Sequence, residues 1–507
     1  MQSVRTLIRG GWVMTDPRLG NEGITPEGAV AVGNDGTVVE TGLYADLRQQ
    51  YPEASVEGGS NLLVMPGLVD AHSHGSGLSY LELGLGYDHL EYWSTYLEGL
   101  NRPDPYLDHL WCGLKHLWSG CTTIHHMGGS LPETVENAVS AYRDLGIRWA
   151  LSLTVKDQNL ITYDDECFQR NLPDHLQEAF RRTFGDEIGD TRTRYLEAFE
   201  EAVSRWHRPG RPVGHAPMGP QWCSEELLGS IGDSARWHQV RVHMHAIQTP
   251  YQREWVHRYH GISPGEYIDR MGLLGPDLTI GHAVWMTGED LDRLAASGSS
   301  VTHHASCNLN MRNGIMPLAP MLSRGINVAV GIDGKGLNDD EDMIQEMRLV
   351  EKLHRIADLS PGSPPGASAQ DVVIMATIGG AQALGLEDVT GTLEAGKAAD
   401  ILAIDMSPRP YLHPDLCPYE ILVLTRKTSD VQLVMVEGNV LLKEGEPTNV
   451  DQLEVARDLA ASVGVRPWSP ERHHLMEDLR PYLVDFFSSW QGAEAGANPY
   501  YVVNRRD

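Results

Sequence analysis

The chain has 507 residues, 41% of them hydrophobic and 21% charged, which is the balance of an ordinary globular protein. Its length predicts one large domain plus a smaller one. A formal net charge of −29 argues against nucleic acid or an anionic membrane as partner. No apolar run is long enough to cross a bilayer, and six scattered cysteines without a CxxC pair predict reduced thiols in a cytoplasmic protein.

Residues 1–60 predict short strands joined by tight turns, including a hairpin turn at Asn34-Asp35-Gly36. A similar pattern returns over residues 386–450, in "GKAADILAIDM" and "VQLVMVEGNVLLKEG". Together the two segments predict one small β-sandwich domain built from both ends of the chain. Residues 451–507 predict a helical C-terminal extension, and its many aromatic residues are expected to pack on the rest of the chain or on a second subunit.

Residues 61–385 alternate short β-like runs with longer, often helical stretches. This alternation predicts an α/β fold, a (β/α)8 TIM-like barrel. The runs are "NLLVMPGLVDAHSH", "CTTIHHM", "RWALSLTV", "PVGHAPMG", "VRVHMHA", "LTIGHAV", "SVTHHAS" and "NVAVGID".

Histidine or aspartate stands at the end of five of these eight runs, where the active site of such a barrel lies. The first run ends in His72-Ser73-His74, and side chains two apart on a strand share a face, so both can hold one ion. One histidine at a strand end is usually a packing residue, but the whole set predicts a metal site. Nitrogen ligands with one carboxylate suit Zn²⁺, with Fe²⁺ as second choice. The other strand-end residues are His243, His245, His282, His303, His304 and Asp333.

Several motifs resemble the amidohydrolase superfamily, in its aminohydrolase and chlorohydrolase branch of cytosine, guanine and adenosylhomocysteine deaminases and triazine hydrolases. The resemblance runs in the same order over about residues 5–450, and also includes "GTLEAGKAADILAID", the branch's usual return to its small β-sandwich. The motifs are "MPGLVDAHSH", "HMHAIQ", "GHAVWM", "THHASCNLNMRNGIMP" and "VAVGIDGKGLNDDEDMIQEMRL".

The resemblance implies one divalent metal ion held by four side chains. Asp333 would also take the proton from the metal-bound water, and His282 would orient the group under attack. Neither the fourth nor the fifth run ends in a lysine that could be carboxylated to bridge two metal ions. This favours a single ion. His243 is expected to pack behind the site. The implied ligands are His72, His74, His245 and Asp333.

Gln248 departs from the branch, which has a glutamate three residues after its fifth-strand ligand. Glutamine can hydrogen-bond to a ring nitrogen but cannot protonate it at neutral pH. Deamination of a nitrogen heterocycle, with His282 and Asp333 moving all protons, is one interpretation. Ring-opening hydrolysis of a lactam, hydantoin or imidazolone is the alternative, and Gln248 as ordinary polar lining is the third. Dehalogenation of a heterocycle is a weaker hypothesis. A non-catalytic scaffold is also weaker, because the chain keeps all four ligands, Asp333 as base and His282.

The remaining pocket candidates come from the loops at the catalytic face. His303 and Asn308 match a substrate-lining stretch of the branch. His304 either contacts the substrate as well or is a plain neighbour of His303. A flat ring could stack on an aromatic side chain of these loops. The branch also implies a homo-oligomer, a dimer or tetramer, acting on a small heterocycle. The other predicted substrate contacts are Gln248, Gln221, Trp222 and Trp93.

Overall fold

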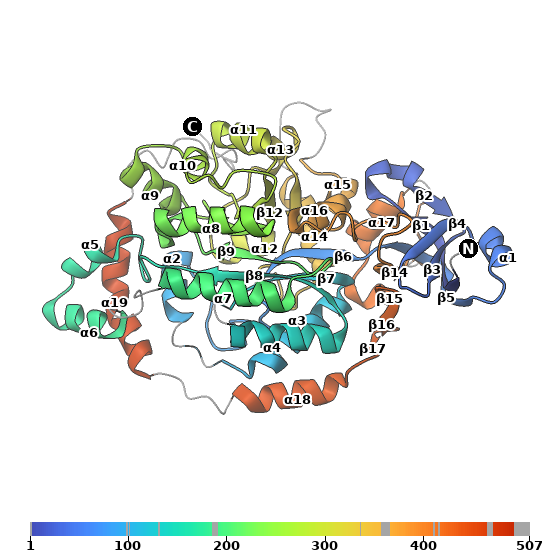
Figure 1. The fold of residues 1–507 in the computed structure, drawn as a ribbon, viewed down its shortest axis with the longest axis horizontal. Coiled ribbons are helices and arrows are strands. Elements are labelled where there is room, and N and C mark those ends of the chain that lie inside the picture. The colour runs from blue at the N-terminus through green and yellow to red at the C-terminus, as the bar shows by residue number, and fades with distance from the viewer. Residues whose placement is uncertain are drawn as a thin grey trace.

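A computed structural model describes residues 3–490 apart from 98–99, 101, 130–131, 185–190, 335, 356–365, 409–410, 414–415 and 464–469. At its centre lie eight parallel strands that neighbour one another in chain order (Figure 1). The first and last strands also meet, where the Asp333 N–H donates to the His72 carbonyl at 2.9 Å, so the barrel is nearly closed. The strands are β6 (Leu68–Ser73), β7 (Cys121–Met127), β8 (Arg148–Val155), β9 (Val213–Pro217), β10 (Val242–Ala246), β11 (Leu278–His282), β12 (Ser300–His303) and β13 (Val328–Val330).

The predicted barrel is confirmed, since each of the eight runs contains one barrel strand. The first run differs in extent, because its residues 61–66 belong to β5 (Ser55–Pro66) of a second sheet. Gly67 joins the two strands, and a Cβ there would lie 2.1 Å from Cγ2 of Thr122. Only glycine therefore fits where the chain passes from one sheet to the other.

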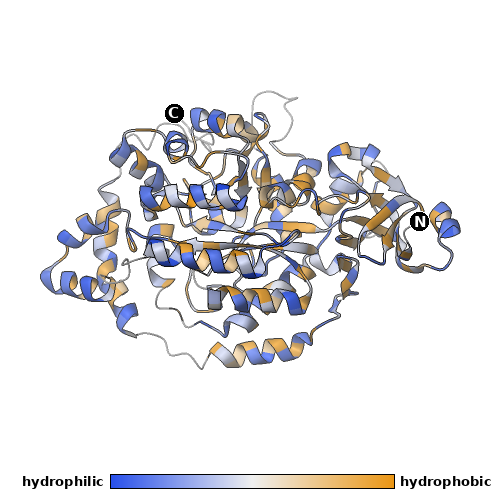
Figure 2. Ribbon diagram, viewed as in Figure 1, coloured by the Kyte–Doolittle hydropathy of each residue, from blue (hydrophilic) through white to orange (hydrophobic). Residues whose placement is uncertain are grey.

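Helices surround the barrel and turn their apolar faces inward (Figure 2). Their ends follow ordinary capping chemistry. The Asp104 side chain accepts the Leu107 N–H ahead of α3, and a Thr287–Asp290 capping box begins α11. The helices that follow the strands are α3 (Pro105–Trp118), α4 (Pro132–Leu145), α7 (Thr191–Trp206), α8 (Glu225–His238), α9 (Pro250–His260), α10 (Pro264–Arg270), α11 (Gly288–Ser297), α12 (Ala305–Asn310), α13 (Leu318–Leu322), α14 (Met343–Leu353), α15 (Ala369–Met375) and α16 (Ile378–Leu384).

The second sheet is mixed and takes its strands from both ends of the chain, as the sequence predicts (Figure 1). Its own apolar core includes Ile8, Val30 and Ile401. The buried ion pair between Arg148 Nε and Asp400 Oδ2, at 2.7 Å, ties it to the barrel. The domain boundaries at 60, 385 and 450 remain predictions. The strands are β1 (Val4–Met14), β2 (Ile24–Pro26), β3 (Gly28–Gly33), β4 (Val38–Leu43), β5, β14 (Ile401–Asp405), β15 (Val431–Val436), β16 (Asn439–Lys443) and β17 (Glu446–Pro447), with α1 (Tyr44–Gln50) after β4 and α17 (Pro418–Thr425) after β14.

The C-terminal extension is helical where the structure describes it. Helix α18 (Gln452–Val463) lies against α3, and α19 (Pro470–Ser488) packs on α2 (Leu90–Tyr96) and α6 (Asp174–Phe184), beside α5 (Asp165–Arg170). Phe487 and Trp490 contact the Tyr163 ring edge to face. The aromatic residues described there therefore pack on the same chain, whereas Tyr500 and Tyr501 lie outside the described residues.

Candidate metal centre and active site

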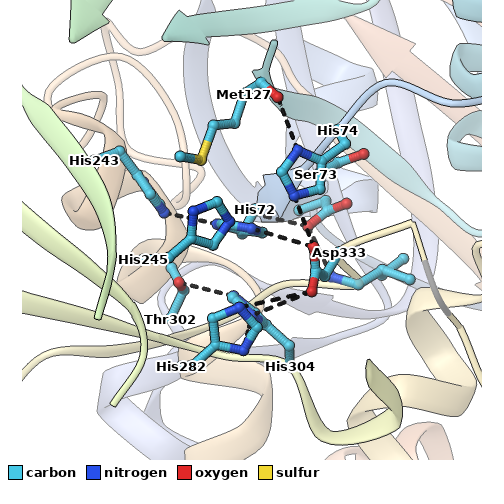
Figure 3. A network of polar contacts seen from close by, with 12 residues as sticks. His72, Ser73, His74, Met127, His243, His245, His282, Thr302, His304 and Asp333 are labelled. Atoms are coloured by element: carbon cyan, nitrogen blue, oxygen red, sulfur yellow. Dashed lines mark hydrogen bonds and ion pairs between the residues drawn. The ribbon is translucent and has the colours of Figure 1, made fainter. Parts of the chain in front are cut away.

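Four of the predicted residues converge where the barrel strands end (Figure 3). One ligand atom each from His72, His74, His245 and Asp333 can be chosen so that all four atoms lie within 4.8 Å of one another. His72 and His74 come from the end of β6, His245 from β10, and Asp333 follows β13. His74 Nε2 is 2.9 Å and His72 Nε2 is 3.4 Å from Asp333 Oδ1. The structure thus brings the sequence-predicted ligand set into one cluster.

The backbone at this site is held in an unusual conformation. Asp333 has φ of 64° and His282 has φ of 74°, both in the left-handed region that side-chain-bearing residues rarely adopt. The hydrogen bond from the Asp333 N–H to the His72 carbonyl fixes the first of these turns. Such local strain persists only where surrounding structure imposes it, and it is concentrated at functional sites.

Two backbone carbonyls orient the outer histidines. His74 Nδ1 lies 2.9 Å from the Met127 carbonyl and His245 Nδ1 lies 3.0 Å from the Met218 carbonyl. A carbonyl only accepts, so each Nδ1 carries the proton and each Nε2 keeps a lone pair. Hydrogen bonds of this kind set the tautomer of metal-binding histidines. Sequence reasoning missed these two contacts, because a backbone carbonyl leaves no side-chain signal.

His72 is fully buried. Figure 3 shows the contact between its ring and that of His243. Its Nδ1 lies 2.8 Å from His243 Nε2, which agrees with the expectation that His243 packs behind the site. Burial lowers the pKa of His72 and that of His243, so both rings are neutral. Within the described part of the chain, His72 Nε2 makes no hydrogen bond.

These residues fit a divalent cation. Burial also lowers the pKa of His245, which leaves a neutral imidazole. Neutral nitrogens and one carboxylate oxygen form the donor set that zinc and related ions prefer. The buried Nε2 of His72 makes no hydrogen bond with the described residues and faces Asp333 Oδ1 at 3.4 Å, which is the arrangement expected of two ligands that share an ion.

His282 faces Asp333 from the opposite side of the cluster. Its Nε2 lies 3.7 Å from Asp333 Oδ2, and its Nδ1 lies 3.0 Å from the Asn308 side-chain oxygen. Because an amide oxygen only accepts, Nδ1 carries the proton and Nε2 faces the carboxylate. His304 Nδ1 lies 3.2 Å from His282 Nδ1, while its Nε2 meets the Thr302 hydroxyl at 2.8 Å. Asn308, predicted as pocket lining, therefore holds His282.

The other residues predicted to contact the substrate lie outside the four-ligand cluster. His303 Nε2 lies 2.8 Å from His354 Nε2, and buried Trp93 packs edge to face on Tyr80 at 4.7 Å. Gln248 and Gln221 are both buried. Half-buried Trp222 lines a cavity of about 730 Å³. Their substrate contacts stay predictions.

One buried carboxylate near Gln248 was missed by the sequence analysis. Glu91, on α2, accepts hydrogen bonds from the hydroxyls of Tyr163, at 2.9 Å, and of Thr249. Gln252 Oε1 accepts the Gln248 N–H at 2.8 Å, so the network holds the segment after β10. Burial raises the pKa of Glu91. The only sequence signal is a glutamate within the apolar stretch "LEYW".

A sequence profile described as the amidohydrolase family matches residues 63–441, which hold every residue of this cluster. The chain belongs to the amidohydrolase family. It is a metal-dependent hydrolase acting on non-peptide C–N bonds, and its ligand cluster accommodates a single divalent ion. In the described part of the chain, no helix is both long and apolar enough to span a membrane.

Similar proteins agree with this assignment. A 5'-deoxyadenosine deaminase of Methanosarcina barkeri is 30% identical over 89% of this chain and 96% of its own length. A 5-methylthioadenosine/S-adenosylhomocysteine deaminase of Moorella thermoacetica is 30% identical over 85% of this chain and 93% of its own. The fold matches the crystal structure of an adenosine deaminase from Xanthomonas campestris with bound zinc, with a TM-score of 0.76, 22% identity, and coverage of 92% of this chain and 99% of that one.

Proposed function

We propose that this amidohydrolase removes an exocyclic amine from a nitrogen heterocycle of the adenine-nucleoside class and releases ammonia. The observation that carries the proposal is the cluster of His72, His74, His245 and Asp333, with His282 beside Asp333. The two 30% identical relatives, both named as deaminases of adenosine derivatives, support the substrate class.

We propose zinc as the ion, with iron as the alternative that the ligand types also allow. Its chemistry, when bound, is Lewis acidity, which brings the pKa of water at such sites to about 7. His74 and His245 would hold it through Nε2, because their Nδ1–H groups are committed to carbonyls. His72 Nε2 and Asp333 would complete the set. The predicted homo-oligomer and cytoplasmic location stay predictions.

Asp333 carries out the proton transfers, while His282 and Gln248 form hydrogen bonds. The Asp333 carboxylate accepts the proton of the attacking water and later delivers it to the departing amine, as a positioned carboxylate can. His282 is fixed by Asn308 with Nε2 towards Asp333, so it can hydrogen-bond the group under attack. Gln248 can hydrogen-bond a ring nitrogen without protonating it.

Ring opening of a cyclic amide is the second candidate, and Gln248 is the observation that favours it. A carbonyl carbon is already electrophilic and needs no protonated ring nitrogen. The amide of Gln248 would then pair with an amide edge of the substrate, donating one hydrogen bond and accepting another.

A product screen separates the two reactions. Zinc-loaded protein would be offered adenosine, 5'-deoxyadenosine, aminopyrimidines and pterins beside lactams, hydantoins and imidazolones, with products read by mass spectrometry. Exchange of an amine for oxygen with free ammonia supports the deaminase. Addition of one water without ammonia rejects it in favour of ring opening.

A further inference from the structure

A cavity of about 730 Å³ lies beside the metal centre. One of its lining residues is Met218, whose carbonyl holds His245, and another is Trp222. The walls come from the segment after β6, the end of β8 and helix α7. This volume is in the range of small-molecule sites. The cavity and the metal centre thus share Met218, which lines the one and orients His245 in the other.

The charged residues described in the cavity lining are positive, whereas the chain has a net charge of −29. Arg102, Lys156 and Arg194 line it, and among the described lining residues there is no aspartate or glutamate. The chain as a whole has 69 acidic and 40 basic residues, so the charged residues described in this lining differ in sign from most of the molecule. The cavity thus forms a cationic patch on a strongly anionic protein.

The three cations make no ion pair with the residues that the structure describes. Lys156 Nζ donates to the Leu160 carbonyl at 3.3 Å, and Arg102 lies 5.8 Å from the Tyr80 ring centre. By contrast Arg192, also on α7, pairs with Glu226 at 3.2 Å and does not line the cavity. Within the described part of the chain, therefore, no carboxylate competes with a ligand for these three cations.

The rest of the lining is largely apolar. Leu97, Leu100, Leu160 and Ile161 contribute side chains, as does Trp222. An apolar wall with cations around it suits a molecule that carries an anionic group on an organic body. Arginine binds a carboxylate or phosphate through two parallel N–H bonds, while lysine acts as a point charge.

We propose that this cavity binds an anionic substituent, a carboxylate or a phosphate, on the substrate of the neighbouring active site. The proposal rests on the proposed function for the substrate, but the anion site itself can be tested without turnover. The heterocycle then reacts at the metal centre while its charged end is held by Lys156, Arg194 and Arg102.

Binding of inorganic phosphate is the direct test. Calorimetry on the zinc-loaded protein at low salt should detect phosphate binding that weakens at least about tenfold in the double variant Lys156→Gln/Arg194→Gln, because charge-assisted hydrogen bonds are lost. The control Arg192→Gln removes a nearby arginine outside the cavity and should bind like the parent. No binding to the parent, or equal binding to parent and double variant, overturns the proposal.

Turnover then shows whether the anion belongs to the substrate. Adenosine, adenosine-5'-carboxylate and adenosine 5'-monophosphate share one ring and differ in charge. We expect an anionic member to have a KM at least about tenfold below that of adenosine, lost in the double variant and weakened by salt. The two anions separate carboxylate from phosphate. Equal KM values for all three overturn a substrate-binding role, whereas absence of ammonia from all three rejects the proposed function and leaves the phosphate test standing.

Discussion

At the residue scale, some contacts of the site can be predicted from the sequence and others cannot. The strand-end histidines and Asp333 could be predicted, because alternation along a strand and barrel geometry send them to one place. The carbonyls of Met127 and Met218 could not, since any residue supplies a carbonyl. Asn308 was found, but its contact with His282 depends on how the chain turns after β12.

Replacing His72 should remove metal and activity together. His72→Asn deletes a buried nitrogen that no described residue hydrogen-bonds, so bound metal should fall from one per chain towards none and turnover should fall at least about a hundredfold. His215→Asn, at a buried strand histidine outside the cluster, is the matched control and should keep its metal. Elemental analysis measures the bound metal, and an ammonia assay measures turnover. Metal retained in His72→Asn would contradict the ligand assignment.

Gln248→Glu tests the departure from the deaminase pattern. The new side chain is buried, and burial favours a protonated carboxyl that can donate to a ring nitrogen. If the chain is a deaminase, kcat/KM on amino-heterocycles should rise about tenfold or more, as general acids contribute. Gln252→Glu is the control, because the Gln252 side chain accepts the backbone N–H of Gln248 and is not predicted to contact the substrate. Unchanged rates and substrate preference would take Gln248 out of the mechanism.

At the scale of elements, periodicity located the barrel strands but not every boundary. The run from 61 to 74 looks continuous because both halves are apolar, yet its register with β14 assigns 62–66 to the second sheet. The contact of α19 with α2 and α6 was also beyond sequence, since an aromatic helix does not specify its partner. This contact places α19 behind the helix that carries Glu91 and Trp93.

A substitution that loosens the packing of α19 should therefore also affect catalysis, because α19 supports α2. Leu479 is fully buried against the apolar cluster of α6, so Leu479→Ala should cost about 2–5 kcal/mol and lower the Tm. Looser support for α2 should raise KM more than it lowers kcat. Val484→Ala, at a more exposed position of the same helix, is the control. A Tm equal to that of the control would mean that α19 does not stabilise the fold.

At the scale of the whole molecule, buried neutral histidines tie stability to pH. His215 lies under Phe199 and between Tyr195 and Ser234, and burial lowers its pKa from 6.5 to about 3. Between these values the unfolded chain binds the proton and the folded chain does not, so stability falls as pH falls.

The size of this effect is measurable by denaturation at several pH values. One such group contributes about 1.4 kcal/mol of lost stability per pH unit between pH 6.5 and 3. His215→Gln should flatten the slope by that amount while lowering stability at neutral pH. An unaltered slope in His215→Gln would contradict the neutral buried ring.

Titration of metal into metal-free protein tests the central claim most directly. Metal would be removed with a chelator, zinc added back in steps, and ammonia release from the best substrate of the screen measured at each step. The account predicts that activity rises in proportion to zinc and saturates at one ion per chain, because one cluster supplies all four ligands. Full activity in the metal-free protein, or saturation only at two ions per chain, would contradict it.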